Sequence, residues 1–201
     1  MNSDRIVKVW DLPIRLFHWL LAVAFFLAYF TEEDWMTVHV WAGYTVIGLV
    51  LFRIVWGFAG TRYARFSDFL CSPTVTVSYL KELMSPRARR YLGHNPAGAA
   101  MIMLLLVAAA VTAVTGLIAY AADEAAGPLA GFVTGNGELW EEVHEISANL
   151  TLLLVCVHVA GVLFESFVHH ENLIKSMVDG NKRAQGPVDR MGDGPRSEES
   201  A

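Results

Sequence analysis

The sequence predicts an all-α integral membrane protein, a four-helix bundle with both termini on the cytoplasmic side. Three observations carry this prediction. Hydrophobic residues make up 54% and charged residues 17% of the 201 residues, whereas soluble domains average about 25% charged residues. Four long apolar stretches each approach or exceed the roughly 20 residues that a helix needs to cross a bilayer. Lysine and arginine are confined to alternate segments between these stretches.

The four stretches define the elements of the predicted bundle. They cover residues 12–30, 37–58, 97–122 and 138–168. The third contains no charged residue, and the fourth is free of charge between Glu145 and Glu165. Arg15 lies near the start of the first stretch, where a long side chain can extend to the lipid headgroups. Each stretch is therefore interpreted as a membrane span.

The distribution of charge orients the bundle. All 15 Lys and Arg residues lie before or at the start of the first span, at the end of the second span, in the loop after it, or beyond the fourth span. In the other two loops and at the start of the fourth span, every charged residue is acidic. These residues are Glu32, Glu33, Asp34, Asp123, Glu124, Glu138, Glu141, Glu142 and Glu145. Because cytoplasmic loops carry the excess of Lys and Arg, both termini are expected in the cytoplasm.

The remaining segments complete the domain organisation. Residues 1–175 are predicted to form one four-span domain, and residues 176–201 a cytoplasmic, disordered tail whose polar composition is clearest from Asp179 onward. A short interfacial helix is expected near residues 75–84. Asn95 and Pro96 have the residue types of an N-cap and a first helical turn, so they predict the start of the third span.

Four histidines in the predicted spans are the candidate functional residues. His144 and His158 are 14 residues apart, which places them on one helical face and about 21 Å apart along the axis. His18 lies near the cytoplasmic end of the first span, and His39 lies near the outer end of the second. The topology therefore pairs His18 with His158 and His39 with His144 at two membrane depths.

Paired histidines on facing helices of a bundle are typical of cofactor sites. An iron porphyrin with two axial imidazoles fits this arrangement, and two filled axial positions favour electron transfer over oxygen binding. The sequence contains no CxxCH motif for covalent haem attachment. We therefore expect two haem b groups, each with its iron held by one histidine pair.

Four further residues are candidates for haem contacts. Arg15 is one turn before His18, and Arg53 follows His39 by 14 residues, so either guanidinium could pair with a haem propionate. Gly43 and Gly116 would let a flat ring approach the backbone. The alternative is that the arginines only anchor the spans at the membrane surface and that the glycines only allow close helix packing.

Two functions of another class compete with the haem interpretation. The four histidines could form a proton relay in a proton-coupled transporter, or the bundle could be a haem-free membrane anchor. Against a transporter, no acidic residue lies at the central depth of any span and no span is broken by a proline in its middle. A zinc site is disfavoured because zinc gathers about four ligands in one place, whereas these pairs lie at different depths.

Four segments of the chain together form a distinctive pattern. They are VWDLPIRLFHWLL (9–21), VHVWAGYTVIGLVLFRIVWGFAG (38–60), YLGHNPAG (91–98) and the fourth-span pair His144 and His158. This pattern resembles the prokaryotic cytochrome b561 family. The family includes the b-type cytochrome subunits of nickel–iron hydrogenases. The resemblance covers roughly residues 6–175 and implies a four-helix bundle with two b haems. His18, His39, His144 and His158 fall on the ligand positions.

The resemblance also implies a function in a bacterial inner membrane. Members carry electrons between the quinone pool and a periplasmic redox partner, which is a hydrogenase in some and a c-type cytochrome in others. Other small members oxidise superoxide and reduce quinone, so the resemblance leaves open whether this chain is itself an enzyme. The acidic outer loops would attract a basic partner such as a c-type cytochrome and repel superoxide, although acidic outer loops also follow from the positive-inside rule alone.

Overall fold

The four predicted spans are the four longest helices of the computed structural model, which describes residues 6–31, 35–83, 90–133 and 135–184. The helices are α1 (Leu12–Tyr29), α2 (Met36–Ala59), α5 (Pro96–Asp123) and α6 (Gly137–Val168). Every end lies within one residue of its prediction. All four helices are long and apolar enough to cross a membrane, so the all-α membrane fold class is confirmed.

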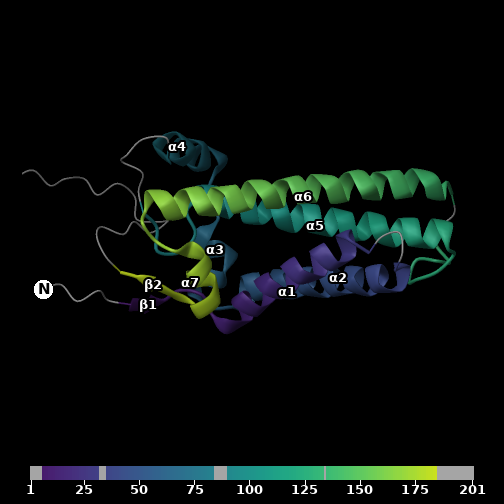
Figure 1. Ribbon diagram of the computed structural model, residues 1–201, viewed down its shortest axis with the longest axis horizontal. Coiled ribbons are helices and arrows are strands. Elements are labelled where there is room, and N and C mark those ends of the chain that lie inside the picture. Colours follow the sequence, from purple (N-terminus) through teal and green to yellow (C-terminus); the bar gives the residue numbers. More distant parts are fainter. Residues whose placement is uncertain (1–5, 32–34, 84–89, 134, 185–201) are drawn as a thin grey trace, which may run out of the picture. The chain divides into compact units, whose positions relative to one another are not determined.

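The chain divides into two compact units. The bundle unit comprises residues 16–55 and 102–159, which are the main parts of the four long helices. The loop unit comprises residues 1–15, 56–101 and 160–201, which include the chain ends and the segment between α2 and α5. The helices of the bundle unit run alongside one another (Figure 1).

Small and β-branched side chains form the core of the bundle unit. Ala24 of α1, Val46 and Val50 of α2, and Ala109 of α5 form one buried cluster. Small residues at such contacts let helix backbones approach closely, which is how helices associate in lipid. The fourth helix is joined to this core by a polar contact, because the hydroxyl oxygens of Thr112 on α5 and Thr151 on α6 lie 2.9 Å apart.

The outward surface of the bundle unit is strongly apolar. Its exposed side chains include Leu20, Val23, Leu27, Leu51, Val55, Leu104, Val107, Val111, Val114, Leu150, Leu153 and Val157. A soluble monomer rarely exposes so large a continuous apolar surface. This surface is therefore the one expected to face the hydrocarbon of a bilayer.

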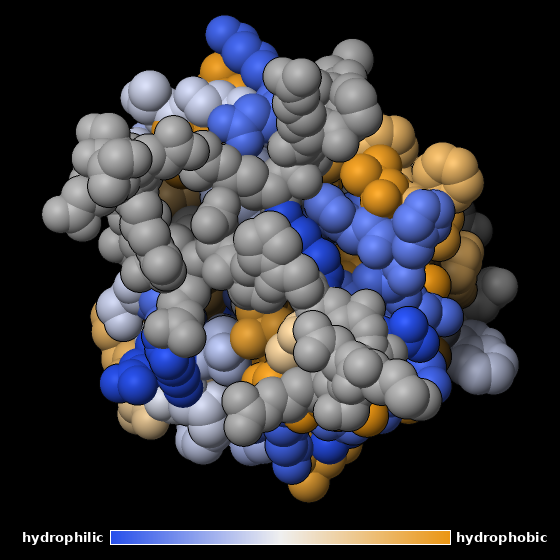
Figure 2. Space-filling view, turned by 90° about the vertical axis from the view of Figure 1, so that its left-hand side faces the viewer, coloured by the Kyte–Doolittle hydropathy of each residue, from blue (hydrophilic) through white to orange (hydrophobic). Residues whose placement is uncertain are grey.

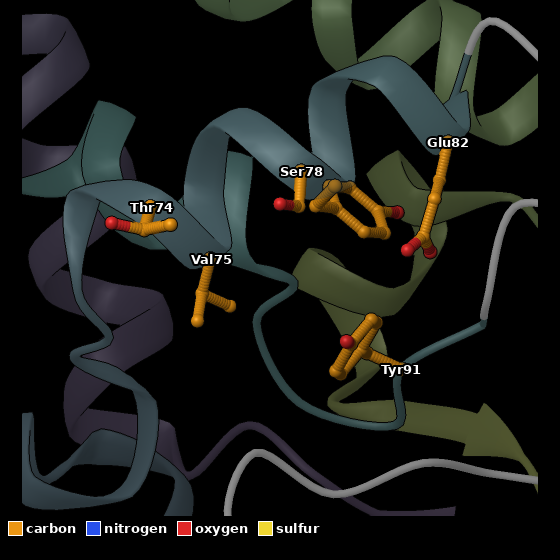
Figure 3. A pocket seen from close by; sticks show the side chains of 6 residues that line it. Thr74, Val75, Ser78, Glu82 and Tyr91 are labelled. Carbon is orange, nitrogen blue, oxygen red and sulfur yellow. The ribbon is translucent and has the colours of Figure 1, made fainter. Parts of the chain in front are cut away.

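The loop unit is built from short elements. They are β1 (Ile6–Lys8), the 3₁₀ turn η1 (Arg62–Ala64), α3 (Phe66–Phe69), α4 (Pro73–Leu83), α7 (Leu173–Asp179) and β2 (Asn181–Arg183). Helix α4 matches the predicted interfacial helix, except that Met84 lies outside the described residues. On the face shown in Figure 2, hydrophilic side chains cover much of the described surface.

The first residues of the predicted tail form regular structure. Residues 176–179 complete α7, and β2 pairs antiparallel with β1, with Val7 opposite Lys182. Gly180 ends α7 with a φ of +84°, a left-handed conformation that glycine adopts without steric cost. Its carbonyl accepts hydrogen bonds from the backbone N–H groups of Val9 and Trp10. The structure thus places residues 176–179 and 181–183 in regular elements, whereas the division into a four-span domain and a tail stays a prediction, because residues 185–201 lie outside the described part of the chain.

The predicted start of the third span is confirmed in detail. Asn95 precedes Pro96, the first residue of α5, and its side-chain oxygen accepts a hydrogen bond from the Gly98 N–H at 2.7 Å. This bond satisfies one of the N–H groups that a helix start leaves without a partner. The amide nitrogen of Asn95 also donates to Glu165 of α6. One side chain therefore caps α5 and links it to α6 within the loop unit.

Candidate functional site

The structure brings the four histidines of the bundle unit together in the two predicted pairs. The ring centroids of His39 on α2 and His144 on α6 lie 5.9 Å apart, and the rings cross at 90°. The centroids of His18 on α1 and His158 on α6 lie 6.4 Å apart at 56°. Helix α6 thus contributes one histidine to each pair. We call these the outer pair and the inner pair, following the orientation expected from the sequence.

The spacing of each pair fits one metal atom between two rings. A metal–imidazole bond is about 2 Å long, and an imidazole nitrogen lies about 1 Å from the ring centre. Two imidazoles on opposite sides of one metal therefore have centroids roughly 6 Å apart. Among the described residues, no group of three or more His, Cys, Asp or Glu is placed to hold a metal ion. The described residues therefore provide two separate histidine pairs for metal binding and no larger cluster of ligands.

Hydrogen bonds orient both rings of the outer pair. Nδ1 of His39 lies 2.9 Å from the carbonyl oxygen of Ala28, and Nδ1 of His144 lies 2.9 Å from that of Thr112. A carbonyl only accepts, so each Nδ1 carries the proton and donates it. Each Nε2 then keeps its lone pair for a metal. The hydroxyl oxygen of Thr115 lies 3.3 Å from the same nitrogen of His144.

The Ala28 carbonyl is available because helix α1 ends one residue later. The last four carbonyls of a helix have no N–H partner within the helix. His39 fills one of these vacancies, and the N–H of Thr31 also approaches the Ala28 oxygen at 3.2 Å. The end of the first helix thereby fixes the ring orientation of a residue on the second.

The inner pair has a different surrounding. In the described part of the chain, neither His18 nor His158 makes a hydrogen bond through a ring nitrogen, and the buried Nδ1 of His18 has no partner. Buried polar atoms nearly always have a partner in proteins. Ring nitrogens without protein partners at this spacing are available to an additional group between the rings.

A cavity adjoins the outer pair. It contains about 510 Å³ of space free of protein atoms, part of it open to the outside. Its lining comes from all four long helices and consists of Phe25, Ala28, Tyr29, His39, Gly43, Val46, Ala109, Thr112, Ala113, His144 and Ala148. A side chain added at Gly43 would meet no atom within 4 Å. Open space therefore lies beside both histidines of the outer pair, with Gly43 in its lining.

Gly116 of α5 lies directly against the ring of His144. A Cβ atom at this position would come within 2.8 Å of Cε1 and 3.1 Å of Nδ1, closer than van der Waals contact allows. Gly116 thus makes room for the imidazole itself. The contacts of Gly43 and Gly116 with a haem stay predictions.

The two arginines singled out from the sequence lie in different units. Arg53 of α2 is only 3% exposed. The rings of its neighbour Phe52 and of Phe17 are 6.3 Å apart, which places Arg53 near the level of the inner pair. The pairing of Arg53 with a haem propionate stays a prediction. Arg15, in the loop unit, donates from Nη1 to the carbonyl of Val178.

Fold and site together define a class of protein. A four-helix membrane bundle with histidines paired across its interior is suited to bind haem for electron transfer, and the residues present fit that group. The family model described as prokaryotic cytochrome b561 matches residues 9–180. The chain belongs to this family, and it is therefore a multi-pass membrane protein that carries haem b and transfers electrons.

Several relatives are similar in sequence to this chain over almost its whole length. A probable Ni/Fe-hydrogenase B-type cytochrome subunit from Azotobacter vinelandii is 28% identical and covers 90% of both chains. The corresponding protein of Cupriavidus necator is 25% identical over 89% of this chain and 88% of its own. A probable Ni/Fe-hydrogenase 1 B-type cytochrome subunit from Escherichia coli K12 is 24% identical over 89% of this chain and 92% of its own. No solved structure gives a significant match.

Proposed function

We propose that this chain is a di-haem b-type cytochrome of the bacterial inner membrane. It transfers electrons between membrane quinone and a redox partner on the periplasmic side. The two histidine pairs, each spaced for one metal atom, are the observation that carries the proposal. His18 and His158 would hold one haem, and His39 and His144 the other.

The chain's own residues set the chemistry of each site. Bound haem supplies an iron atom that takes up and releases one electron at a time. Two histidines would hold each iron, an arrangement that favours electron transfer over oxygen binding. The Ala28 and Thr112 carbonyls hold the outer rings with Nε2 available, and Arg53 supplies positive charge near the inner pair. The two sites are about 21 Å apart along α6, the rise of 14 helical residues.

A hydrogenase is the favoured periplasmic partner. The names of the relatives, which describe cytochrome subunits of Ni/Fe-hydrogenases, support this choice. The segments predicted to face the periplasm carry exposed carboxylates at Asp123, Glu124, Glu138, Glu141, Glu142 and Glu145. These would steer a partner with a basic docking face, so a basic c-type cytochrome is the second candidate.

The orientation rests on charge. The absence of Lys and Arg from the other two loops of the sequence supports cytoplasmic termini. In this orientation the outer pair is nearer the periplasmic partner, and the loop unit faces the cytoplasm. Quinone and quinol reach the protein through the surrounding lipid.

Haem stoichiometry tests the proposal. The full chain is purified in detergent, its reduced-minus-oxidised visible spectrum is recorded, and haem is extracted into pyridine and counted per chain. Two haem b per chain are expected. No haem, under conditions that load another b-type cytochrome made in parallel, would instead support a transporter or a membrane anchor.

Oxidation by a quinone analogue tests the proposed electron transfer between haem and quinone. The protein is reduced with dithionite, freed of excess reductant and mixed with a water-soluble quinone analogue. Oxidation of both haems is expected. A protein with two haems that no quinone oxidises, although a chemical oxidant does, would overturn the quinone assignment and leave haem binding intact.

A further inference from the structure

The two histidine pairs differ in what surrounds their imidazole rings. Both rings of the outer pair donate Nδ1–H to a backbone carbonyl, His39 to that of Ala28 and His144 to that of Thr112. Among the described residues, neither ring of the inner pair has such a partner. A hydrogen bond from the distal nitrogen makes an imidazole a stronger electron donor to its metal.

Stronger donation favours the more positive state of the iron. Ferric iron carries one more positive charge than ferrous iron, so basic ligands stabilise it and lower the reduction potential. Hydrogen bonding around the ligands is one of the protein's means of setting this potential. The two hydrogen bonds at the outer pair therefore lower the reduction potential of its iron relative to that of the inner pair, which has no such bond among the described residues.

Fixed charges act in the same direction. The carbonyl that orients His39 belongs to the C-terminal turn of α1, where the helix dipole places partial negative charge. Glu145 follows His144 directly on α6, with an exposed carboxylate. The buried guanidinium of Arg53 lies instead near the level of the inner pair. Negative charge stabilises ferric iron at the outer pair, and positive charge stabilises ferrous iron at the inner pair.

We infer that the outer pair holds its iron at a lower reduction potential than the inner pair, with the Ala28 and Thr112 carbonyls, Gly116 and Arg53 as positioning and tuning groups. The inference rests on the proposed function, because it requires one haem at each pair. One electron passing from the outer to the inner iron oxidises the first, reduces the second and moves no proton. That transfer is then energetically downhill.

Potentiometric titration of the haem spectrum tests the inference. Wild-type protein should titrate in two one-electron steps. His39→Ala and His144→Ala should each remove the lower-potential step, whereas His18→Ala and His158→Ala should each remove the higher one. Removal of the higher step by loss of an outer histidine would overturn the inference. Wild-type protein with fewer than two haems would contradict the proposed function instead.

Milder variants test the cause while leaving the ligands in place. Gly116→Ala should push the His144 ring away from the Thr112 carbonyl, so the lower-potential step should shift upward with haem content retained. Gly48→Ala is the matched control, since an added Cβ there meets no atom within 4 Å. Equal potentials in the two glycine variants, both loaded with two haems, would contradict the role of the carbonyl bond.

Substitution of Arg53 tests the inference independently. Arg53→Gln should lower the midpoint potential of the higher-potential step and leave that of the other step unchanged. Arg53→Lys should retain most of the wild-type potential because the positive charge remains. A purely structural role would change the stability of both variants without moving one step selectively. A shift confined to the lower-potential step would contradict the inference, because it would mean that Arg53 does not act on the higher-potential iron assigned to the inner pair.

Discussion

The imidazole rings of His39 and His144 cross at 90°, whereas those of His18 and His158 are inclined at 56°. Axial rings in similar planes split two iron d orbitals, and perpendicular rings leave them nearly equal in energy. We expect two low-spin ferric signals in the electron paramagnetic resonance spectrum. The more anisotropic signal should belong to the outer pair and disappear in His144→Ala. Its persistence in that variant would contradict the assignment.

Loss of single ligands should separate the two haems. His18→Ala and His158→Ala are expected to lose the same haem, and His39→Ala and His144→Ala the other, because each iron needs both rings of its pair. Haem per chain, measured after pyridine extraction, should fall from two toward one in all four variants. His170→Ala is the control, since His170 is exposed in the loop unit. A shared loss for His18 and His39 would refute the pairing.

Asn95 should matter through two separate contacts. Asn95→Ala removes both the cap of α5 and the bond to Glu165, and loss of the cap alone typically costs about 1 kcal/mol. Asn95→Ser keeps a capping oxygen and should lose less stability. Asn95→Asp also keeps the cap but sets a carboxylate against Glu165, so its deficit should shrink at acidic pH. Thermal unfolding in detergent measures all three, and equal losses would contradict the double role.

The buried Lys182 should make the loop unit more stable at alkaline pH. Burial lowers the pKa of its ammonium below the ordinary value of 10.5, and Arg90 adds to this, although Glu171 and Glu165 act in the opposite direction. Between the lowered pKa and 10.5, the unfolded chain binds more protons than the folded chain. Stability should therefore rise with pH across that interval.

Lys182→Met tests this pH dependence. The variant removes the buried charge but keeps an apolar chain near Trp10, over whose ring the amine lies at 5.6 Å. It should unfold at a higher temperature than wild type at neutral pH and lack the alkaline rise. Lys175→Met, at an exposed position, should behave as wild type. An alkaline rise that survives Lys182→Met would assign the effect to another group.

The sequence was sufficient for the spans and the histidine pairs because both follow from long-range regularities. Apolar length and the distribution of Lys and Arg define the helices and their directions, and helix direction places His18 near the depth of His158. The surroundings of the rings were not predictable in this way. The groups that accept from His39 and His144 are backbone carbonyls, which every residue possesses. Their identity depends on where α1 ends and how α5 packs.

Short elements were missed for a related reason. Strands β1 and β2 have three residues each and lie at opposite ends of the sequence, so neither shows an alternating pattern long enough to recognise. Arg15 shows a different limit. Its spacing from His18 predicts a propionate partner, and that pairing stays a prediction. The bond from its guanidinium to the Val178 carbonyl could not be predicted, because composition had assigned part of that helix to the tail.

The pairing of β1 with β2 also has a consequence for biosynthesis. Strand β1 is synthesised before the four long helices, and its partner β2 is synthesised after them. Strand β1 therefore stays without its partner until the segment that follows α6 has been made. A chain that ended before Gly180 would leave β1 without its partner strand and the backbone N–H groups of Val9 and Trp10 without their acceptor. Pairing of β1 with β2 thus requires that all four long helices have already been synthesised.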